Sequence, residues 1–479
     1  MLEILRYSLR MTQNKMKLSF EDIAAATGAK ILQKGPAKDA LNVCIDSRLI
    51  KKGDFFIAIK GPHFDGHDFI DEVIEKGACA VIRSKKQEAG SRKEGVWVLE
   101  VADTVKALGD IAAAWRRKND IKVVAVTGSN GKSTTKEMIA AGLSTLRRVI
   151  KTEGNFNNLI GLPLQVLRDI ENYDVALFEM GMNAPGEIRR LAEIASPDIG
   201  VITNVNPAHL EKLHTVENVA KAKGELFEAM RPDGIIIVNA EDPWVMKLAS
   251  GYKGKKTTFG MQNGCDVQFG RLISEGLDRT DLTFYIKGRE FSMRLPVPGV
   301  HNVMNAMAAI AVGVALGVSP LIMVPDLERF SNMKMRMERI QLLNGVQVIN
   351  DCYNANPSSM QAALRTLSVA KRAGRFIAVL GDMLELGEAA PSKHVELGEG
   401  VATFGVNKLF IAGDFAADVA KGAKAKGMND SDIKIENDLE VLKDDVTREI
   451  KTGDVVLVKG SRGMKMERVV EHLKSEIGV

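Results

Sequence analysis

The chain has 479 residues, too many for a single hydrophobic core, so about three domains are expected. Hydrophobic residues make up 45% of it and charged residues 26%, as in ordinary soluble globular proteins. The 65 basic and 61 acidic residues nearly balance, which argues against a basic nucleic-acid-binding surface. No apolar run approaches the roughly 20 residues of a membrane helix, so membrane insertion is not expected, and a monomer is the default assembly.

The first segment, residues 1–116, mixes helix and strand patterns. A helix is expected over Phe20 to Thr27, and strands over Phe55 to Ile59 and Ala80 to Ile82. The stretch Met1 to Arg10 lacks the basic start and apolar core of a signal peptide. The four cysteines are far apart and show no metal-binding spacing, which predicts buried reduced thiols in a cytoplasmic protein: Cys44, Cys79, Cys265 and Cys352.

Two polar stretches in this segment are candidates for holding an anionic group. They are Asp46-Ser47-Arg48 and Asp65-Gly66-His67. The guanidinium of Arg48 has the fork geometry that suits phosphate oxygens.

The middle segment, residues 117–327, opens with the most informative stretch of the chain. The apolar run Ile121 to Val126 predicts a buried parallel strand, and a helical pattern begins at Lys132. Between them lies a glycine turn, so backbone N–H groups, the helix N-terminus and the Lys132 ammonium can all meet phosphate oxygens. The hydroxyl of Ser133 suits Mg²⁺. The stretch predicts a nucleoside triphosphate site formed by Thr127, Gly128, Ser129, Asn130, Gly131, Lys132, Ser133 and Thr134. An ordinary strand-to-helix turn that contains a lysine is the alternative.

Strand and helix patterns alternate through this segment, which predicts a mostly parallel sheet with helices on both faces. Glu179 ends the strand Val175 to Glu179 and could bind Mg²⁺, although a solvated acid at a strand end is commoner. His209 follows the strand Ile199 to Thr203 and could be a second metal ligand, but a lone histidine is more often structural. A further strand is expected over Ile235 to Asn239.

Two asparagine-rich stretches also suit polar ligands, because amides both donate and accept hydrogen bonds. The first contains Asn155, Asn157 and Asn158 ahead of a Gly-x-Pro bend, and from these residues alone an asparagine-rich turn is the better explanation. The second opens an alanine-rich helix, where Asn302 and Asn305 share a face and could read an adenine edge. Helix capping by Asn302 is the alternative.

The third segment, residues 328–479, begins in the methionine-rich stretch Phe330 to Arg339 and again alternates strands and helices. Asp351, at the end of one strand, could accept hydrogen bonds from ribose hydroxyls. Strands are expected over Val346 to Asp351, Arg375 to Leu380, Lys408 to Ala412 and Asp454 to Lys459.

Taken together, these stretches resemble the Mur ligases, the ATP-dependent amide-forming enzymes of bacterial cell-wall synthesis. The resemblance extends from about Asp46 to Glu467. The short loop Thr127 to Ser133 is common to a superfamily that includes folylpolyglutamate synthases. More specific stretches are Gly154 to Leu164, Tyr353 to Pro357, Leu380 to Gly387 and Val458 to Gly463. They are typical of the members that add D-alanyl-D-alanine to UDP-N-acetylmuramoyl-tripeptide.

The resemblance implies an α/β protein of three domains. These would be a UDP-muramoyl-peptide-binding domain (1–116), a central ATP-binding domain (117–327) and a Rossmann-like domain (328–479). ATP and Mg²⁺ would be required. It implies catalytic roles for Lys132, Glu179, His209 and Lys223. Lys223 would be carbamylated, because only the carbamate could hold a second Mg²⁺. Lys221, two residues earlier, is its competitor for that role.

The resemblance also assigns ligand contacts. Asn302 and Asn305 would hold adenine, Asp351 ribose and Arg336 a phosphate. Since adenine and ribose contacts are then expected from a different segment than the phosphate loop, domain closure on ATP is expected. The implied metal ligands are Ser133, Glu179, His209 and Lys223. The implied substrate contacts are Ser47, Arg48, Asp65, His67, Asn155, Asn157, Asn158, Tyr353, Asn354 and Asn356.

The chain departs from the family pattern at three positions. Met335 precedes Arg336 where glycine is common, Cys352 stands where serine is frequent, and Ala184 follows Asn183 where histidine is common. The rival functions are a folylpolyglutamate-synthase-like ligase, a nucleotide-driven motor or switch, and a non-catalytic nucleotide-binding module. The motifs leave open whether lysine or diaminopimelate is the third residue of the peptide substrate.

Overall fold

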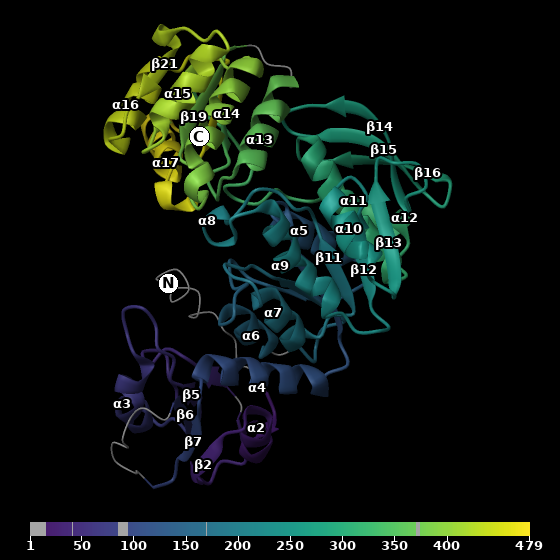
Figure 1. Ribbon diagram of the computed structural model, residues 1–479, viewed down its shortest axis with the longest axis vertical. Helices are drawn as coiled ribbons and strands as arrows, with labels where there is room; N and C mark the ends of the chain where they lie inside the picture. Colours follow the sequence, from purple (N-terminus) through teal and green to yellow (C-terminus); the bar gives the residue numbers. More distant parts are fainter. Residues whose placement is uncertain (1–15, 41, 85–93, 169, 370–373) are drawn as a thin grey trace.

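The computed structural model describes residues 16–40, 42–84, 94–168, 170–369 and 374–479. The expectation about a signal peptide at Met1 to Arg10 lies outside these residues. The three larger sheets follow one another along the chain, and each lies inside one of the three predicted segments (Figure 1). The boundaries at 116/117 and 327/328 stay predictions. No helix in the described ranges is long and apolar enough to cross a membrane.

The first segment contains a five-stranded sheet in the order β2-β7-β6-β5-β4, of which only β2 is antiparallel. A two-stranded ribbon, β1 with β3, lies beside it. The strands are β1 (Leu18–Ser19), β2 (Lys30–Gln33), β3 (Asp39–Ala40), β4 (Val43–Cys44), β5 (Phe55–Ile57), β6 (Ala80–Ser84) and β7 (Trp97–Val101). The helices are α2 (Phe20–Thr27), η2 (Gly66–Phe69), α3 (Ile70–Glu75) and α4 (Thr104–Lys118).

The middle segment is a nine-stranded sheet in the order β16-β15-β14-β13-β12-β11-β8-β10-β9, parallel from β9 to β14 and antiparallel beyond. Its strands are β8 (Lys122–Thr127), β9 (Val149–Lys151), β10 (Val175–Glu179), β11 (Ile199–Ile202), β12 (Ile235–Asn239), β13 (Lys255–Gly260), β14 (Val267–Glu275), β15 (Thr280–Ile286) and β16 (Arg289–Leu295). Its helices are α5 (Lys132–Leu143), α6 (Gly161–Val166), α7 (Glu187–Ala195), α8 (Leu210–Leu213), α9 (Val216–Glu228), α10 (Pro243–Ser250), α11 (Val300–Ala315) and α12 (Pro320–Leu327).

Strand β8 shows why the apolar run in this segment is continuous. Val123 and Ala125 pack into the same core cluster as Leu191 of α7, whereas Val124 and Val126 pack into the cluster of α5, α11 and α12. Successive side chains of a strand point to opposite faces, so a strand covered on both faces must be apolar at every position.

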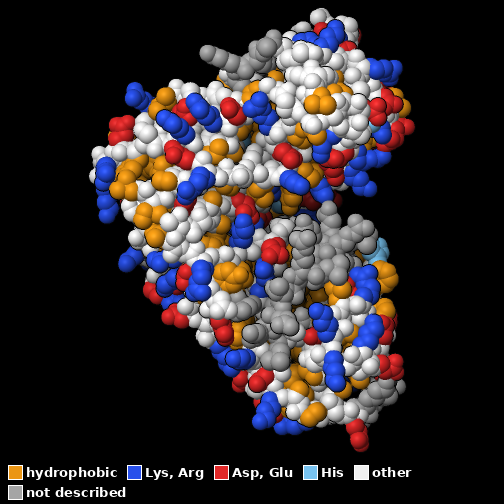
Figure 2. Space-filling view, turned by 180° about the vertical axis from the view of Figure 1, so that it is seen from behind, with side chains coloured by type: hydrophobic (Ala, Val, Ile, Leu, Met, Phe, Trp, Pro, Cys, Tyr) orange, Lys and Arg blue, Asp and Glu red, His pale blue; other side chains and the backbone are white. Residues whose placement is uncertain are grey.

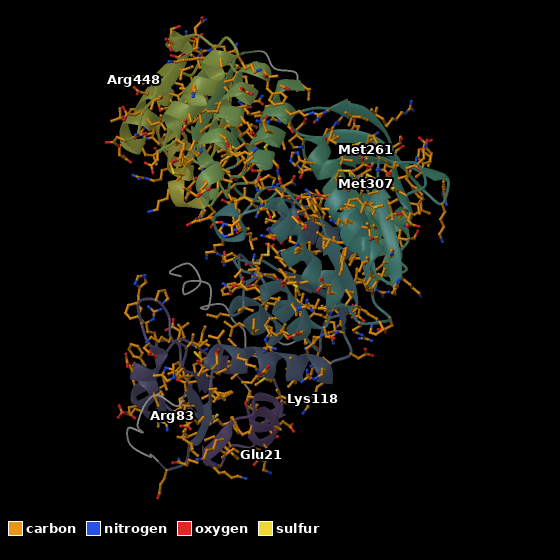
Figure 3. The ribbon with its side chains drawn as sticks, in the orientation of Figure 1. Glu21, Arg83, Lys118, Met261, Met307 and Arg448 are labelled. Atoms are coloured by element: carbon orange, nitrogen blue, oxygen red, sulfur yellow. The ribbon has the colours of Figure 1, made fainter. Side chains whose placement is uncertain are left out.

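Met307 of α11 is fully buried inside this segment, and Arg448 lies at the outer rim of the third (Figure 3).

The third segment has a six-stranded sheet in the order β17-β18-β22-β19-β20-β21, parallel except for β17, which confirms the Rossmann-like expectation. Its strands are β17 (Glu338–Gln341), β18 (Gln347–Asn350), β19 (Phe376–Gly381), β20 (Lys408–Ala412), β21 (Ile433–Ile435) and β22 (Val455–Lys459). Its helices are α13 (Pro357–Val369), η3 (Gly387–Ala389), α14 (Ala390–Thr403), α15 (Ala416–Ala425), η4 (Asp430–Asp432), α16 (Leu439–Glu449), η5 (Arg462–Met464) and α17 (Glu467–Ile477).

Most predicted elements agree with the structure to within one or two residues. The prediction of four buried thiols is wrong, however. Only Cys352 is buried, and Cys44, Cys79 and Cys265 are partly exposed. Basic and acidic side chains intermingle over the face of the molecule shown in Figure 2.

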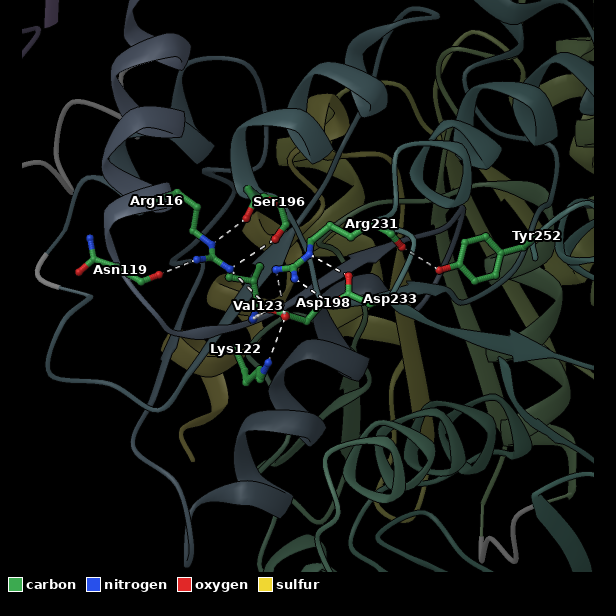
Figure 4. Close-up of polar contacts among 10 residues, drawn as sticks. Arg116, Asn119, Lys122, Val123, Ser196, Asp198, Arg231, Asp233 and Tyr252 are labelled. Atoms are coloured by element: carbon green, nitrogen blue, oxygen red, sulfur yellow. Dashed lines mark hydrogen bonds and ion pairs between the residues drawn. The ribbon is translucent and has the colours of Figure 1, made fainter. Parts of the chain in front are cut away.

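A buried arginine joins the first segment to the middle one. Helix α4 packs on α2 and also on α6 and α7, so it bridges the two segments (Figure 1). In its last turn, Arg116 donates to the carbonyls of Ala195, Asn119 and Ser196 and approaches Asp198 at 3.5 Å (Figure 4). Helix carbonyl ends carry partial negative charge, which suits a guanidinium. Arg116 therefore holds together the last turn of α4, the loop at Asn119 that leads to β8, and the end of α7.

Replacing Arg116→Ala should lower the free energy of unfolding by about 3 kcal/mol, because two buried carbonyls and one partly buried carbonyl lose their donor. Urea denaturation followed by tryptophan fluorescence measures this change. Arg117→Ala is the matched control, because Arg117 is the exposed neighbour on the same helix. Equal midpoints for the two variants would contradict the role given to Arg116.

Candidate active site

A cleft of about 580 Å³ lies where the middle and third segments meet. Its walls include the carboxyl ends of β8, β10 and β11, the edge where parallel sheets bind ligands. Most predicted site residues line it: Ser129, Asn130, Gly131, Lys132, Ser133, Thr134, Asn155, Asn157, Asn158, Glu179, His209, Lys223, Asn302, Asn305, Arg336, Asp351, Tyr353, Asn354 and Asn356.

The predicted phosphate loop connects β8 to α5. Gly131 has φ 80°, and a Cβ there would lie 2.3 Å from Asn305 Oδ1. A Cβ on Gly128 would lie 1.9 Å from Thr203 Oγ1. The first N–H groups of α5 have no partner within the helix, and residues 131–134 line the cleft. The loop therefore requires glycine at both positions and offers N–H donors to an anion.

Lys132, the first residue of α5, is partly buried in this loop. Its ammonium donates to the carbonyl of Gly128 at 2.9 Å. Burial lowers the pKa of Lys132, Glu179 opposes that shift and Arg336 adds to it. Within the described residues, Glu179 is the one carboxylate that acts on the Lys132 ammonium, so this cation is suited to bind phosphate oxygens.

The loop after β11 braces the phosphate loop from behind. Thr203 Oγ1 donates to the carbonyl of Asn130 at 2.6 Å, and Asn204 Oδ1 accepts from the N–H of Asn130 at 2.9 Å. Ser129 Oγ donates to the carbonyl of Asn206 at 2.9 Å. Two adjacent strands thus hold the backbone of residues 129–130 in one conformation.

Glu179 ends β10 and is 3% exposed. Its Oε1 accepts from Asn157 Nδ2 at 2.9 Å, whereas its Oε2 is buried with no hydrogen-bond partner. Burial alone would raise the pKa of Glu179, but Lys136, Lys132 and Arg336 hold that pKa below its usual value. An ionised carboxylate with a free oxygen is a ligand that Mg²⁺ prefers.

The structure separates the two candidate lysines of α9. Lys221 is exposed and forms an ion pair with Glu217 at 3.2 Å. Lys223 is 2% exposed and lines the cleft. Burial, together with the charge of Lys132, holds the pKa of Lys223 well below the usual lysine value. A neutral amine is the form that reacts with CO₂, so only Lys223 has the surroundings that carbamylation needs.

His209 and Arg336 complete the polar lining of the cleft. His209 Nδ1 lies 2.6 Å from Glu385 Oε2 of the third segment, and this hydrogen bond lowers the pKa of Glu385. Arg336 Nη2 donates to Ser133 Oγ at 2.9 Å, its guanidinium stacks over Tyr353, and its Nε is buried without a partner. The Nε–H group of Arg336 is therefore available to donate a hydrogen bond to a phosphate oxygen.

The side chains present fit Mg²⁺ only in part. No cluster of three or more His, Cys, Asp and Glu side chains occurs in the part of the chain that the structure describes. Glu179 Oε2, the Ser133 hydroxyl and His209 would supply some ligands. The others would have to come from phosphate oxygens or from a carbamate on Lys223.

Asn302 and Asn305 do share a face of α11, as predicted. Asn305 Nδ2 donates to Asn302 Oδ1 at 3.2 Å, and Asn302 Nδ2 donates to the carbonyl of Pro298, so Asn302 is not a side-chain cap. The expectation that adenine contacts come from another segment than the phosphate loop does not fit the residues named for it, because Asn302 and Asn305 lie on α11, which packs on α5. Asp351 and Arg336 are the candidate nucleotide contacts that come from the third segment.

Six predicted residues do not line this cleft, and one of them is Gly128, at the start of the phosphate loop. Thr127 is fully buried beneath it and donates to the carbonyl of Met180. The others lie in the first segment: Ser47, Arg48, Asp65 and His67. Asp65 binds His67 Nδ1 at 2.6 Å, and His67 Nε2 accepts from Ser84 N, so both ring nitrogens are engaged.

Arg48 is the first-segment residue best placed for an anion. Asp46 holds two of its nitrogens, at 2.9 and 2.7 Å. The Arg48 side chain is nevertheless 63% exposed, so its outer edge stays accessible.

Sequence reasoning missed several polar residues of the site. Lys459 is buried and donates to Asp351 Oδ2 at 2.6 Å. Lys136 is buried against the carbonyl of Thr152 at 2.6 Å. Thr203 and Asn204 shape the phosphate loop. The signal for Lys459 was its position at the end of a buried strand, where parallel sheets place ligand contacts.

Comparison with known proteins agrees with this geometry. Three family descriptions match the chain: "Mur ligase family, catalytic domain" over 41–116, "Mur ligase middle domain" over 126–313 and "Mur ligase, glutamate ligase domain" over 335–462. A Bacillus subtilis protein named UDP-N-acetylmuramoyl-tripeptide–D-alanyl-D-alanine ligase is 39% identical over 431 residues, which are 90% of this chain and 92% of the relative.

Solved structures give the same result. MurF from Acinetobacter baumannii has a TM-score of 0.88 at 30% identity, covering 97% of this chain and 100% of that one. MurF ligase from Thermotoga maritima in complex with ADP has a TM-score of 0.82 at 31% identity, covering 91% and 97%. The chain belongs to the Mur ligase family.

Gly131→Ala should weaken ATP binding roughly tenfold or more, because a Cβ in this conformation costs about 1–2 kcal/mol and here also meets Asn305. Isothermal titration calorimetry with ATP measures the affinity. Gly427→Ala is the matched control, because Gly427 has φ +91° and a Cβ added there would meet nothing within 4 Å. Its stability should fall while its ATP affinity does not change. Unaltered affinity in Gly131→Ala would rule out the loop as the phosphate site.

Proposed function

We propose that the protein joins D-alanyl-D-alanine to UDP-N-acetylmuramoyl-tripeptide, with ATP converted to ADP and phosphate. The supporting observation is a single cleft that combines the phosphate loop, a buried carboxylate with a free oxygen, a buried lysine and the third segment. The similarity to ligases of this activity extends over about nine tenths of the chain. The reaction consumes ATP and UDP-linked sugar, so we place it in the cytoplasm, with the protein acting as a monomer.

The first step transfers a phosphoryl group. A carboxylate oxygen of the tripeptide attacks the γ-phosphorus of ATP, the bond to the β-phosphate oxygen breaks, and ADP leaves. Repulsion between the two anions opposes this approach, and Lys132 and Arg336 reduce it with positive charge close to the phosphates. Bound Mg²⁺, held by Ser133, Glu179, His209 and a carbamate on Lys223, would add further charge neutralisation.

The second step forms the amide. The amine nitrogen of D-alanyl-D-alanine attacks the carbonyl carbon of the acyl phosphate, the amine loses a proton, and phosphate leaves from the tetrahedral intermediate. The side chains act by holding reactants and charges in place, since none is required as a covalent nucleophile. The amides of Asn155, Asn157 and Asn158 and the polar residues Tyr353, Asn354 and Asn356 border the space available to the peptide.

The first segment is proposed to hold the UDP-sugar end of the substrate. Arg48 would meet the diphosphate with its exposed edge, beside Ser47, and Asp65 and His67 would shape the neighbouring loop. A folylpolyglutamate-synthase-like ligase would leave these features unused. A non-catalytic module would leave the orphaned Glu179 oxygen and Lys223 unused, and the balanced charge of the chain disfavours a motor acting on nucleic acid.

ADP release by the purified protein should require both UDP-N-acetylmuramoyl-tripeptide and D-alanyl-D-alanine, and a coupled assay measures it with each peptide variant, lysine or diaminopimelate. Lys132→Ala should lower turnover at least a hundredfold, since loss of one such group costs about 2.7–4 kcal/mol of barrier. Its thermal midpoint should stay close to that of the parent. A rise in ADP release with folate and glutamate instead would favour the rival ligase.

Lys223 should carry a carbamate, formed when its neutral nitrogen attacks CO₂ and loses a proton. With ¹³C-bicarbonate, a carbamate carbon signal is expected in the parent protein and in Lys221→Ala but not in Lys223→Ala. Turnover in CO₂-free buffer should fall and recover on addition of bicarbonate, and Lys223→Ala should show no such response. A signal that persists in Lys223→Ala and disappears in Lys221→Ala would reverse the assignment.

A further inference from the structure

One side-chain contact beside the cleft joins the middle segment to the third. His209 precedes α8, and its Nδ1 lies 2.6 Å from Glu385 Oε2. The backbone forms a second bond at the same place, because Glu211 N donates to the carbonyl of Glu385 at 3.1 Å. The two segments thus meet at His209 through a side chain and the main chain together.

The backbone at this contact adopts conformations that side chains disfavour. His209 has φ 55° and Glu385 has φ 63°, both in the left-handed region. Residues other than glycine persist there only where surrounding contacts enforce it, and such strain concentrates at functional sites. A Cβ on Gly387 would lie 3.2 Å from Glu211 Cα, so the two loops are in close contact. The surrounding structure therefore holds both loops, the one with His209 and the one with Glu385, in the conformations that bring these two side chains together.

The third segment holds the loop of Glu385 firmly from below. Leu384 N donates to Ser461 Oγ at 2.8 Å, and Met383 N donates to Nε2 of the fully buried His394 at 3.0 Å. The carboxylate of Asp382 accepts hydrogen bonds from the backbone N–H groups of Asp414 and Phe415, in the loop that follows β20. Glu385 thus lies in a loop at the carboxyl end of β19 whose backbone is fixed by hydrogen bonds to the rest of the third segment.

The contact determines which nitrogen of His209 carries the hydrogen. A glutamate at neutral pH only accepts hydrogen bonds, so Nδ1 of His209 must be the donor. In the neutral imidazole the lone pair then lies on Nε2, in a ring that lines the cleft. A carboxylate on one nitrogen of histidine fixes the ring and makes the other nitrogen a better ligand or acceptor.

We propose that Glu385 is a positioning residue that acts through His209. It holds the imidazole as the Nδ1–H tautomer with Nε2 available at the cleft, and it does so only when the third segment lies against the middle one. The inference deepens the proposed function and rests on it. It makes the orientation of His209 depend on the segment that also supplies Arg336.

The first test observes the ring directly, without metal or substrate. The chain has seven histidines, and ¹⁵N-histidine labelling with a His209→Ala reference assigns the signal of His209. In the parent, Nδ1 should show a protonated shift and Nε2 an unprotonated one. Glu385→Ala should give averaged shifts, and Glu385→Gln, whose amide oxygen still accepts, should largely restore them. An Nε2–H tautomer in the parent would overturn the proposal.

The second test is a double-mutant cycle on turnover. Glu385→Ala should lower turnover roughly tenfold to hundredfold, as is common for groups that orient a ligand. In the His209→Ala background the same change should have no further effect, because Glu385 acts through that ring. The matched control is Glu388→Ala, which removes an exposed carboxylate three residues away and should behave like the parent. Parental turnover in Glu385→Ala, or additive losses in the cycle, would overturn the proposal.

The two tests distinguish this inference from the proposed function. If the parent releases no ADP in response to D-alanyl-D-alanine, the proposed function fails. The tautomer of His209 and its response to Glu385→Ala still show whether Glu385 positions the ring. If the parent is active and the ring is unaffected by Glu385→Ala, the inference fails and the proposed function stands.

Discussion

The candidate site depends on the way in which the loop after β11 braces the phosphate loop. Thr203 and Asn204 bond the backbone of Asn130, and Gly128 allows Thr203 to approach closer than any side chain would permit. The loop backbone is therefore shaped before any ligand arrives. Preorganised donors need no rearrangement when charge develops on a bound group, and this accounts for much of the catalytic effect of such loops.

Positively charged side chains, buried or partly buried, dominate the electrostatics around this loop. Lys132, Lys136 and Arg336 lie close to one carboxylate, Glu179, and hold its pKa below the usual value. Buried like charges are unfavourable unless an anion compensates them. A triphosphate supplies that charge. Burial, together with the charge of Lys132, lowers the pKa of Lys223 and leaves its nitrogen in the nucleophilic form.

The third segment completes the cleft with contacts that reach across to the middle one. Arg336 meets Ser133, and Asn356 Nδ2 donates to Asn130 Oδ1 at 2.7 Å. Met335 and Met337, which flank Arg336, both have left-handed backbone, at φ 61° and 51°. Met335 stands where the family commonly has glycine, so this chain accepts backbone strain in order to direct Arg336 toward the loop. With this departure from the family pattern, Arg336 still lines the cleft and bonds Ser133.

The sequence by itself determined the fold class, most strands and the phosphate loop. These follow from local patterns: continuous apolar runs such as Ile121 to Val126, and glycines whose conformations other residues disfavour. It also identified most side chains of the cleft, since residues that follow parallel strands meet at one sheet edge. Only the tertiary structure separated Lys223 from Lys221 and placed α11 beside the loop. It alone joined Glu385 to His209 and buried Lys459 against Asp351. Burial and pairing between residues far apart in the chain arise from packing, and local sequence carries no record of which partner lies opposite.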